Sequence, residues 1–397
     1  MLPPAWPGAM RSILCKAPAN QQYTMSEERP ILLREDAAQG GIVRTLLALS
    51  IAAATFGPGP NGEPAREPQL AANGSVVALV YGAGHSIFFA RSTDGGTHFD
   101  PAVLVSEGAI VPLNRHRGPH LAFAGSTIVV TAVIGNTAAE GPHAHGLPSD
   151  GNLISWRSLD GGKTWSHGAP VNDAPDASTE GLHGLAAGSG GRLFAVWLDK
   201  RDKTTKLYGA LSLDAGKTWS KNVLVYASPD ATICECCHPS VVFDHDGGIL
   251  VMFRNWLEGS RDLYLTRSTD GVQFSPAHKL GTGTWKLNAC PMDGGGIADS
   301  EAGVVTAWRR ERSIFLARPG APEIKIGEGT DVAITAGSGG VYTIWSTPES
   351  IEILTPVETK PVAVGSKGAF PAITALPAGG AVAAWESEGK IVVKHLR

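Results

Sequence analysis

The sequence has no basic stripe and no apolar run long enough for a convincing membrane span. Its 33 Lys and Arg face 37 Asp and Glu, a formal net charge of −4, so neither a nucleic acid partner nor a membrane span in the mature chain is expected. Cysteine is scarce, at 5 residues. In contrast, 49 Gly and 27 Pro supply many turns, and 43% of the 397 residues are hydrophobic. This composition is typical of a turn-rich β protein with a sizeable core, in one large domain or two smaller ones.

The N-terminal segment differs from the rest of the chain. Residues 1–42 show no strand or helix period, and residues 43–56 combine one positive charge, a short apolar run and small residues. This pattern is typical of a signal peptide. It predicts a disordered leader over residues 1–57, with the signal-like segment at 43–57 and a translation start near Val43; a buried N-terminal helix is the alternative. A cleaved signal would make the mature protein secreted or periplasmic and would remove Cys15.

One short pattern occurs four times. It reads Ser-x-Asp-x-Gly-x-x-aromatic at residues 92–99, 158–165 and 212–219, and it lacks one residue at 268–274. Each copy follows a short apolar run, which predicts a turn between antiparallel strands. The Asp carboxylate can accept backbone N–H bonds within the turn, and the Gly permits a backbone conformation that other residues resist. These Asp residues are therefore interpreted as turn stabilisers rather than as catalytic groups.

This pattern resembles the Asp-box, or BNR, repeat of the sialidase superfamily, and the resemblance covers the chain from about Arg66 to its C-terminus. The resemblance implies a β-propeller, in which units that cannot bury their own hydrophobic faces stack around an axis. It does not imply one activity, because such repeats occur in sialidases, in other glycosidases and in non-catalytic propellers.

A second repeat indicates the number of blades. Apolar runs, several of them ending in Trp and most of them preceded by a Gly-rich turn, lie at residues 76–81, 128–134, 193–198, 249–253, 304–308, 341–345 and 381–385. The chain is therefore predicted to be all-β, with four-stranded antiparallel blades in a single domain over residues 58–397. Seven blades are favoured over the six of the fold that the sequence resembles. The last unit lacks a fourth strand, which an N-terminal segment could supply.

The sharpest cluster of reactive residues is Cys234-Glu-Cys236-Cys237-His238, joined further along the chain by Cys290. Cys237 and Cys290 each precede the first strand of consecutive predicted blades. First strands are innermost in a propeller, so these two residues should meet at one mouth of the central channel. Outside the cytoplasm, such cysteines can form disulfides. Together with His238 they can instead bind a soft metal, copper or zinc, or act as redox thiols, and the alternatives stay open.

The sialidase resemblance implies three Arg that hold a substrate carboxylate, a Tyr nucleophile activated by Glu, and an Asp acid/base. Arg66 takes the place of the first Arg, with Glu67 where the family has Ile. The candidate catalytic residues are Arg66, Glu180, Arg254 and Asp293, and the candidate ligand-binding residues are Arg117, His120 and His183. None of the 6 Tyr stands in an evident Tyr–Glu arrangement. Sialoside hydrolysis is therefore in doubt, whereas other glycosidases need only two carboxylates.

Three functions are compatible with these residues. The first, based mainly on the resemblance, is an extracytoplasmic propeller that binds or hydrolyses glycans, or binds another small molecule, at the channel mouth. The second, based on the residues themselves, is a Cys/His protein that binds copper or zinc or carries out thiol redox chemistry. The third is a non-catalytic interaction scaffold.

Overall fold

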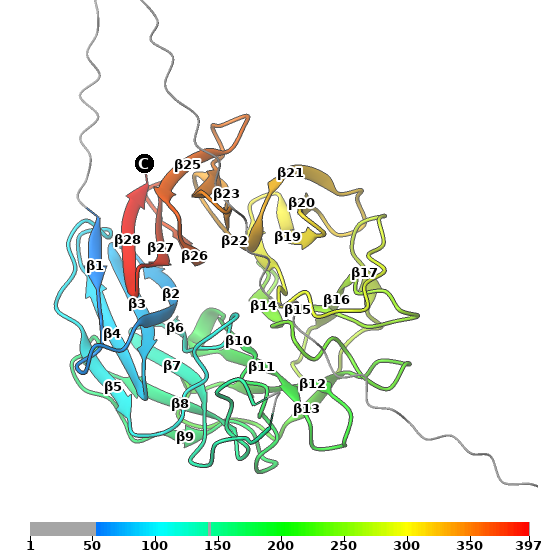
Figure 1. Cartoon of the computed structure of the whole chain (residues 1–397), viewed down its shortest axis with the longest axis horizontal. Coiled ribbons are helices and arrows are strands. Elements are labelled where there is room, and N and C mark those ends of the chain that lie inside the picture. Colours follow the sequence, from blue (N-terminus) through cyan, green and yellow to red (C-terminus); the bar gives the residue numbers. More distant parts are fainter. Residues whose placement is uncertain (1–52, 142–143, 397) are drawn as a thin grey trace, which may run out of the picture.

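The computed structural model describes residues 53–141 and 144–396. These residues form seven four-stranded sheets, and Figure 1 shows the sheets arranged as blades around a central axis. The prediction of an all-β propeller with seven blades is confirmed. The single helical turn among the described residues is a 3-10 turn at Ser189–Gly191. No helix in this part of the chain is long and apolar enough to cross a membrane.

Successive strands of each blade run from the axis outward, since the first strands of neighbouring blades contact one another. The inner strands are β2 (Ala65–Asn73), β6 (His120–Ala124), β10 (His183–Ala187), β14 (Ser240–Phe243), β18 (Gly296–Ser300), β22 (Thr330–Gly337) and β26 (Ala369–Ala375). The second strands are β3 (Val76–Ala83), β7 (Thr127–Ile134), β11 (Leu193–Asp199), β15 (Ile249–Arg254), β19 (Gly303–Arg310), β23 (Gly340–Ser346) and β27 (Ala381–Ser387). The third strands are β4 (Ser86–Ser92), β8 (Asn152–Ser158), β12 (Lys206–Ser212), β16 (Leu263–Ser268), β20 (Ser313–Ala317), β24 (Ser350–Leu354) and β28 (Lys390–Leu396). The outer strands are β5 (Val103–Glu107), β9 (Ala169–Pro170), β13 (Val223–Tyr226), β17 (His278–Lys279), β21 (Ile324–Glu328), β25 (Val362–Ser366) and β1 (Ala54–Phe56).

The ring closes through its first strand. β1 pairs antiparallel with β28 and so completes the last blade, as the sequence predicted for an N-terminal segment. The ring of Phe56 lies 5.7 Å from that of Phe99 and 6.0 Å from that of Tyr81, which joins the last blade to the first. β1 falls inside the segment predicted to be signal-like, so the propeller includes these three residues. The remainder of that segment, through residue 52, lies outside the described residues.

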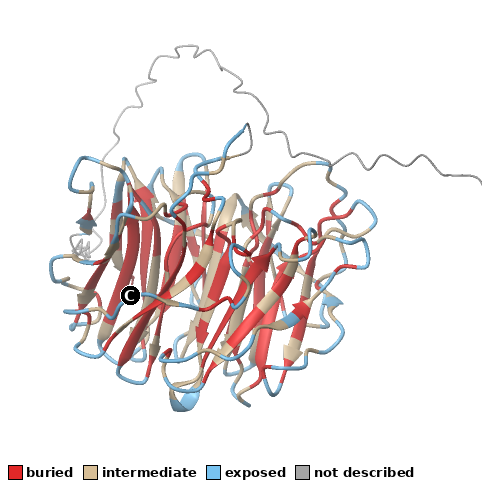
Figure 2. Ribbon diagram, turned by 90° about the horizontal axis from the view of Figure 1, so that it is seen from below, coloured by how far each residue is buried: buried red, intermediate tan, exposed pale blue. Residues whose placement is uncertain are grey.

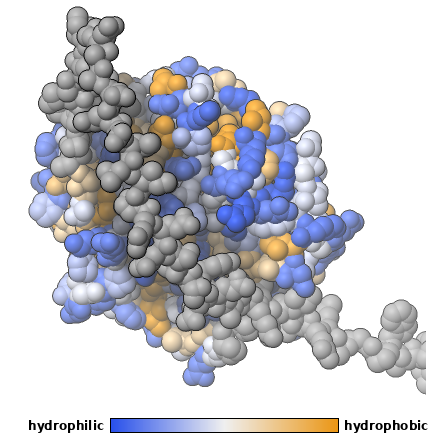
Figure 3. Space-filling view, turned by 45° about the horizontal axis from the view of Figure 1, so that its top comes forward, coloured by the Kyte–Doolittle hydropathy of each residue, from blue (hydrophilic) through white to orange (hydrophobic). Residues whose placement is uncertain are grey.

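The hydrophobic core is divided among the interfaces between blades. The second strands β7, β11 and β15 are buried along almost their whole length, because a neighbouring blade packs on each of their faces. Figure 2 shows buried strands standing side by side through the molecule, with exposed residues concentrated in the connecting loops. This two-sided burial explains why the second strands read as continuous apolar runs rather than as an alternating pattern. The face in Figure 3 is largely hydrophilic, with scattered hydrophobic residues.

The four repeated turns carry the hydrogen bonds that their sequence predicts. In the third copy, Ser212 Oγ donates to Asp214 Oδ1 over 2.9 Å and accepts the N–H of Gly216 over 2.9 Å. Each turn also packs on the preceding blade. A Cβ at Gly162, whose φ is +91°, would lie 2.0 Å from Cε1 of Phe89 in the first blade. These positions therefore require glycine for two reasons, the left-handed backbone and the close approach.

We expect Ser212→Ala to lower the free energy of unfolding by about 1–2 kcal/mol, because the buried N–H of Gly216 would lose its acceptor. The neighbouring Leu213 side chain is exposed, so Leu213→Ala is a matched control that should change stability little. Urea unfolding of both variants measures the difference. Equal stability of Ser212→Ala and the wild-type protein would contradict the role assigned to this serine.

Candidate functional site

Residues far apart in the sequence meet where the inner strands begin. The Nε2 atom of His116, which precedes β6, lies 3.1 Å from Oδ1 of Asp331 in β22, although 215 positions separate the two residues. Arg66 at the start of β2 forms an ion pair of 2.9 Å with Glu386 of the last blade. One rim of the propeller therefore collects charged side chains from several blades.

Three inner strands carry the same irregularity at this rim. The strand register shifts around Glu67 in β2, Asp331 in β22 and Phe370 in β26. These residues have φ values of 53°, 58° and 49°, respectively, in the left-handed region that non-glycine residues seldom adopt. Such strain costs on the order of 1–3 kcal/mol per residue and is concentrated at functional sites. Bulges of this kind redirect side chains at the ends of sheets.

All three bulge residues contact His116. A carboxylate oxygen of Glu67 accepts the backbone N–H of His116 over 3.1 Å. The imidazole of His116 contacts Asp331 through Nε2. The Phe370 ring lies edge-on to the same imidazole, with the two ring centres 5.2 Å apart. Glu67 is also held through its own N–H, which donates to Glu386 over 2.7 Å. We call Glu67, His116, Asp331, Phe370 and Glu386 the His116 cluster.

The two carboxyl groups that bracket His116 have opposite protonation tendencies. Burial raises the pKa of Glu67 well above its ordinary value, and the opposing attraction of His116 does not cancel this effect. Burial also raises the pKa of Asp331, but the hydrogen bond and charge of His116 outweigh it and lower that pKa overall. Burial alone would lower the pKa of His116, yet the bond to Asp331 and the nearby Asp293 and Glu67 raise it to about 9. The cluster therefore favours the protonated form of Glu67 and the ionised form of Asp331, on either side of a histidine that is an imidazolium at neutral pH.

Asp293 and Arg309 support this cluster from the fifth blade. Asp293 is buried, and its Oδ2 accepts the N–H of Asp331 over 3.0 Å and lies 3.4 Å from Nε of Arg309. The candidate catalytic Asp293 therefore lies beside the cluster, bonded to its backbone. The candidate catalytic Arg254 is 1% exposed, and its guanidinium donates to the backbone oxygens of Asp293, Arg261 and Arg309. These bonds brace the fourth blade against the fifth; a catalytic role for Arg254 stays a prediction.

The second and third blades contribute a separate group at the rim. Arg117 is buried and donates to the backbone oxygen of Glu180 over 2.5 Å, and its guanidinium lies 3.4 Å from the Glu180 carboxylate, which also pairs with Lys200. The rings of His120 and His183 lie 4.4 Å apart. Burial, together with repulsion from neighbouring histidines, lowers the pKa of His120 well below its ordinary value. Burial also lowers the pKa of His183, to about 4. Both rings are therefore neutral at physiological pH.

The three clustered cysteines come together next to this rim. The Sγ atom of Cys234 lies 3.4 Å from that of Cys237 and 3.7 Å from that of Cys236, and all three residues are buried. Cys290 packs against them. The ring of His238 lies 4.4 Å from that of His116, and its Nε2 is 3.0 Å from the backbone oxygen of Gly295. The structure thus brings together the ligand atoms of three of the five residues predicted to bind a metal, Cys234, Cys236 and Cys237, while the His238 ring packs against His116.

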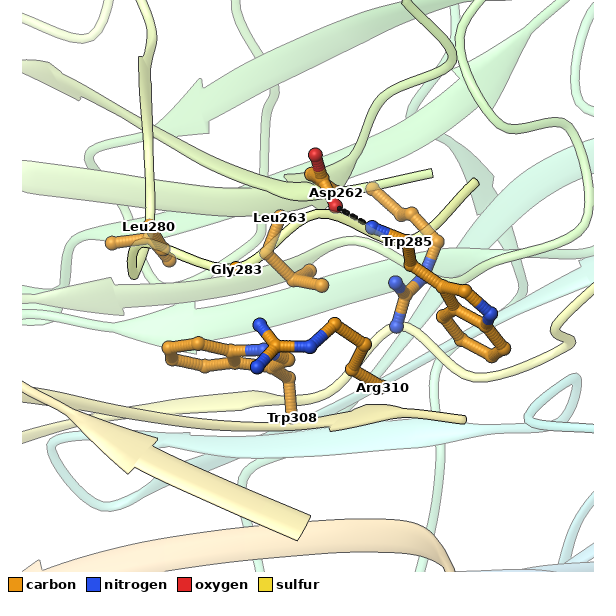
Figure 4. Close-up of a pocket in the computed structure, with 8 residues that line it drawn as sticks. Asp262, Leu263, Leu280, Gly283, Trp285, Trp308 and Arg310 are labelled. Carbon is orange, nitrogen blue, oxygen red and sulfur yellow. Dashed lines mark hydrogen bonds between the residues drawn. The ribbon is translucent and has the colours of Figure 1, made fainter. Parts of the chain in front are cut away.

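A small cavity lies between the fourth and fifth blades. Figure 4 shows its lining residues, among them Trp285, Trp308 and Arg310, with the Trp285 N–H donating to Asp262 over 2.8 Å. Its volume of about 10 Å³ admits about one water molecule. A sugar would not fit there, so the rim offers the better candidate site.

Comparison with known proteins is consistent with this architecture. No protein-family model matches the sequence, and no curated protein matches it. Among solved structures, a PL25 ulvan lyase bound to -[GlcA(1-4)Rha3S]- has a TM-score of 0.52 at 10% identity, covering 84% of this chain and 94% of that one. The chain shares the propeller fold of this lyase.

Two further structures show similar coverage. The polysaccharide lyase Uly1 matches with a TM-score of 0.50 at 10% identity, over 84% of this chain and 90% of that one. An α-L-arabinanase of Penicillium chrysogenum matches with a TM-score of 0.49 at 15% identity, over 87% of this chain and 98% of that one. At these identities the likeness to the lyases establishes the fold alone.

Proposed function

We propose that this chain binds a glycan at the rim where the inner strands begin and hydrolyses a glycosidic bond there. The observation that supports the proposal is the pair of carboxyl groups of Glu67 and Asp331, held on either side of His116 with opposite protonation tendencies. Two carboxyl groups whose environments separate their pKa values are the usual acid and base or nucleophile of a glycosidase.

The residues take distinct roles in this reaction. Glu67, protonated because it is buried, donates a proton to the oxygen of the leaving sugar. Asp331, kept ionised by His116, stabilises or attacks the developing positive charge on the other sugar, or activates water. His116 is a positioning residue that holds both carboxyl groups. Arg66, whose side chain is 44% exposed beside Glu386, is placed to contact an anionic or hydroxyl group of the glycan.

Two other findings support a glycan ligand and a location outside the cytoplasm. Polysaccharide lyases have the same propeller fold. The signal-like segment at residues 43–57 supports a secreted or periplasmic protein, with cleavage before β1 begins at Ala54 so that the ring keeps its closing strand. The proposal does not extend to sialosides. The His116 cluster, as defined from the described residues, contains no tyrosine that could serve as the sialidase nucleophile, and Glu67 stands where sialidases have Ile.

The test is incubation of the full chain with a panel of polysaccharides and fluorogenic glycosides, including arabinan and ulvan. We expect new reducing ends from at least one glycan, and loss of that product in Asp331→Asn. Binding of a glycan with no turnover would overturn hydrolysis and favour a non-catalytic scaffold. An unsaturated sugar at the new end would also overturn hydrolysis, because it is the product of elimination.

A further inference from the structure

The three buried thiols form a site that the glycan chemistry does not use. The ligand atoms of Cys234, Cys236 and Cys237 all lie within 4.8 Å of one another, and none of the three cysteines is in a disulfide. Thiolates bound to one metal ion at the Zn–S distance of about 2.3 Å would be separated by a little under 4 Å. The observed Sγ separations of 3.4 and 3.7 Å need only a small adjustment to reach that geometry.

Two buried arginines point to negative charge on these sulfur atoms. The Nη1 atom of Arg261 lies 3.0 Å from Sγ of Cys234, and Arg261 is 2% exposed. Arg254, 1% exposed, adjoins the same cluster, because its backbone oxygen accepts the N–H of Cys234 over 3.2 Å. Within the described part of the chain, neither guanidinium forms an ion pair with a carboxylate. Buried charges are normally paired, so the thiol cluster is the candidate counter-charge for both.

We propose that Cys234, Cys236 and Cys237 bind one Cu(I) ion as a three-thiolate centre. Soft thiolate sulfur selects Cu(I) or zinc among biological metals. Three thiolates with a monovalent ion leave two negative charges, which Arg254 and Arg261 balance, whereas a divalent ion would leave one arginine uncompensated. Zinc sites are almost always four-coordinate, whereas among residues 53–141 and 144–396 the group of side chains close enough together contains three ligands. On binding, the thiol protons are released to solvent, so no oxidant or reductant is needed.

The spacing Cys234-x-x-Cys237-His238 is also that of c-type haem attachment. The geometry does not fit that cofactor. The two sulfur atoms lie 3.4 Å apart within the packed core and cannot reach two separate vinyl groups of a rigid macrocycle. The His238 ring is packed against His116 rather than free to bind an iron above the two cysteines.

The experiment is a competition titration of the full chain, reduced and stripped of metal under anaerobic conditions, with Cu(I) against a Cu(I) chelator. We expect one Cu(I) per chain and an X-ray absorption spectrum with three sulfur neighbours. Because these measurements use the wild-type protein, they decide the proposal even if a cysteine variant fails to fold. No bound copper, fewer than three sulfur neighbours, or uptake of one Zn(II) with no Cu(I) would overturn it. A disulfide within the trio, in protein isolated from an oxidising compartment, would also overturn it.

Variants assign the ligands. Cys236→Ser, at the least buried of the three cysteines, should lose the bound copper. Arg261→Gln should weaken Cu(I) binding by about 10-fold, as the loss of a group that supports a ligand does. Met292 also packs against the cluster, and Met292→Leu should bind Cu(I) like the wild-type protein. Wild-type affinity in Cys236→Ser would contradict the assignment, and so would equal losses in Arg261→Gln and Met292→Leu.

Discussion

Glu67→Gln is expected to lower kcat/KM for a glycan substrate by about 10²- to 10⁴-fold, the usual contribution of a general acid. The amide cannot deliver a proton to the leaving oxygen. It can still accept the His116 N–H through its own oxygen, so the geometry of the cluster should be kept. The measurement is steady-state kinetics on the substrate that the glycan panel identifies.

Three further measurements separate acid catalysis from a structural role. A glycoside with an activated leaving group, which needs no protonation, should be turned over by Glu67→Gln nearly as fast as by the wild-type protein. The alkaline limb of the wild-type pH profile should disappear in the variant, because burial raises the pKa of Glu67. Glu328→Gln, at an exposed carboxylate on an outer strand, should retain full activity. A loss in Glu67→Gln that is equal for all leaving groups would assign Glu67 to structure alone.

The same substitution is expected to stabilise the protein at neutral pH. A carboxyl group whose pKa is raised on folding contributes stability below its unfolded pKa and loses that contribution as the pH rises. Glutamine carries no charge, so Glu67→Gln should unfold at a higher temperature than the wild-type protein at pH 7. Greater stability with lower activity is the behaviour of a strained functional residue.

The second large effect is a loss of stability as the pH rises from about 6.5 to about 9. The pKa of His116 is raised from 6.5 to about 9 in the folded protein. Its contribution is therefore fully present below pH 6.5 and is lost as the pH rises through about 9. The raised pKa corresponds to roughly 3 kcal/mol of unfolding free energy. Urea unfolding at a series of pH values measures the loss.

Asp331→Asn tests whether His116 causes this loss of stability, because the Asp331 carboxylate accepts the hydrogen bond that stabilises the protonated imidazole of His116. The variant should show a much flatter dependence of stability on pH over the same range. His98 also contacts an Asp, but its side chain is 85% exposed, and a His98→Gln variant should keep the wild-type slope. If Asp331→Asn and the wild-type protein lose the same stability between pH 6.5 and 9, another group is responsible.

The fold was predictable because its signals are local and repeated. The turn at residues 212–219 and its three relatives each carry their own hydrogen-bonding residues. Two-sided burial makes the second strands continuously apolar, as in β11. The last repeat unit has one strand too few, which predicts that an N-terminal segment completes its blade. Residues 54–56 supply that strand, although the sequence pattern places them in the leader.

The site was predictable only in part, because it depends on a backbone irregularity. Arg66 is predicted from the sialidase resemblance and Asp293 from its position near the start of an inner strand, and both lie at the rim. Glu67 was noticed as a departure from the sialidase pattern and not as a catalytic group, while Asp331, Glu386 and Phe370 were missed. A signal was present: Glu67-Pro-Gln-Leu, Asp331-Val-Ala-Ile and Phe370-Pro-Ala-Ile stand at equivalent places in their blades. Recognising them requires knowing that the register shifts there.

The cysteine cluster was visible in the sequence, but its counter-charge was not. Cys234, Cys236 and Cys237 are neighbours in the chain, so their proximity follows from spacing alone. In the sequence, the adjacent charges of Arg261 and Asp262 are typical of a solvated loop, whereas the Arg261 side chain is buried against sulfur. Which side of a loop faces the interior is decided by packing that the sequence does not show, here by the Trp256 ring of the same β15–β16 loop, which lies 4.3 Å from the Arg261 guanidinium.

The pairing of β1 with β28 has a consequence for the order of assembly. While the ribosome is still synthesising the polypeptide, the blades can form only an open arc, because the partner of the earliest strand does not yet exist. The pairing of β1 with β28, over three residue pairs, therefore forms last. Removal of either β1 or β28 would leave the last blade incomplete and the ring open at the same place.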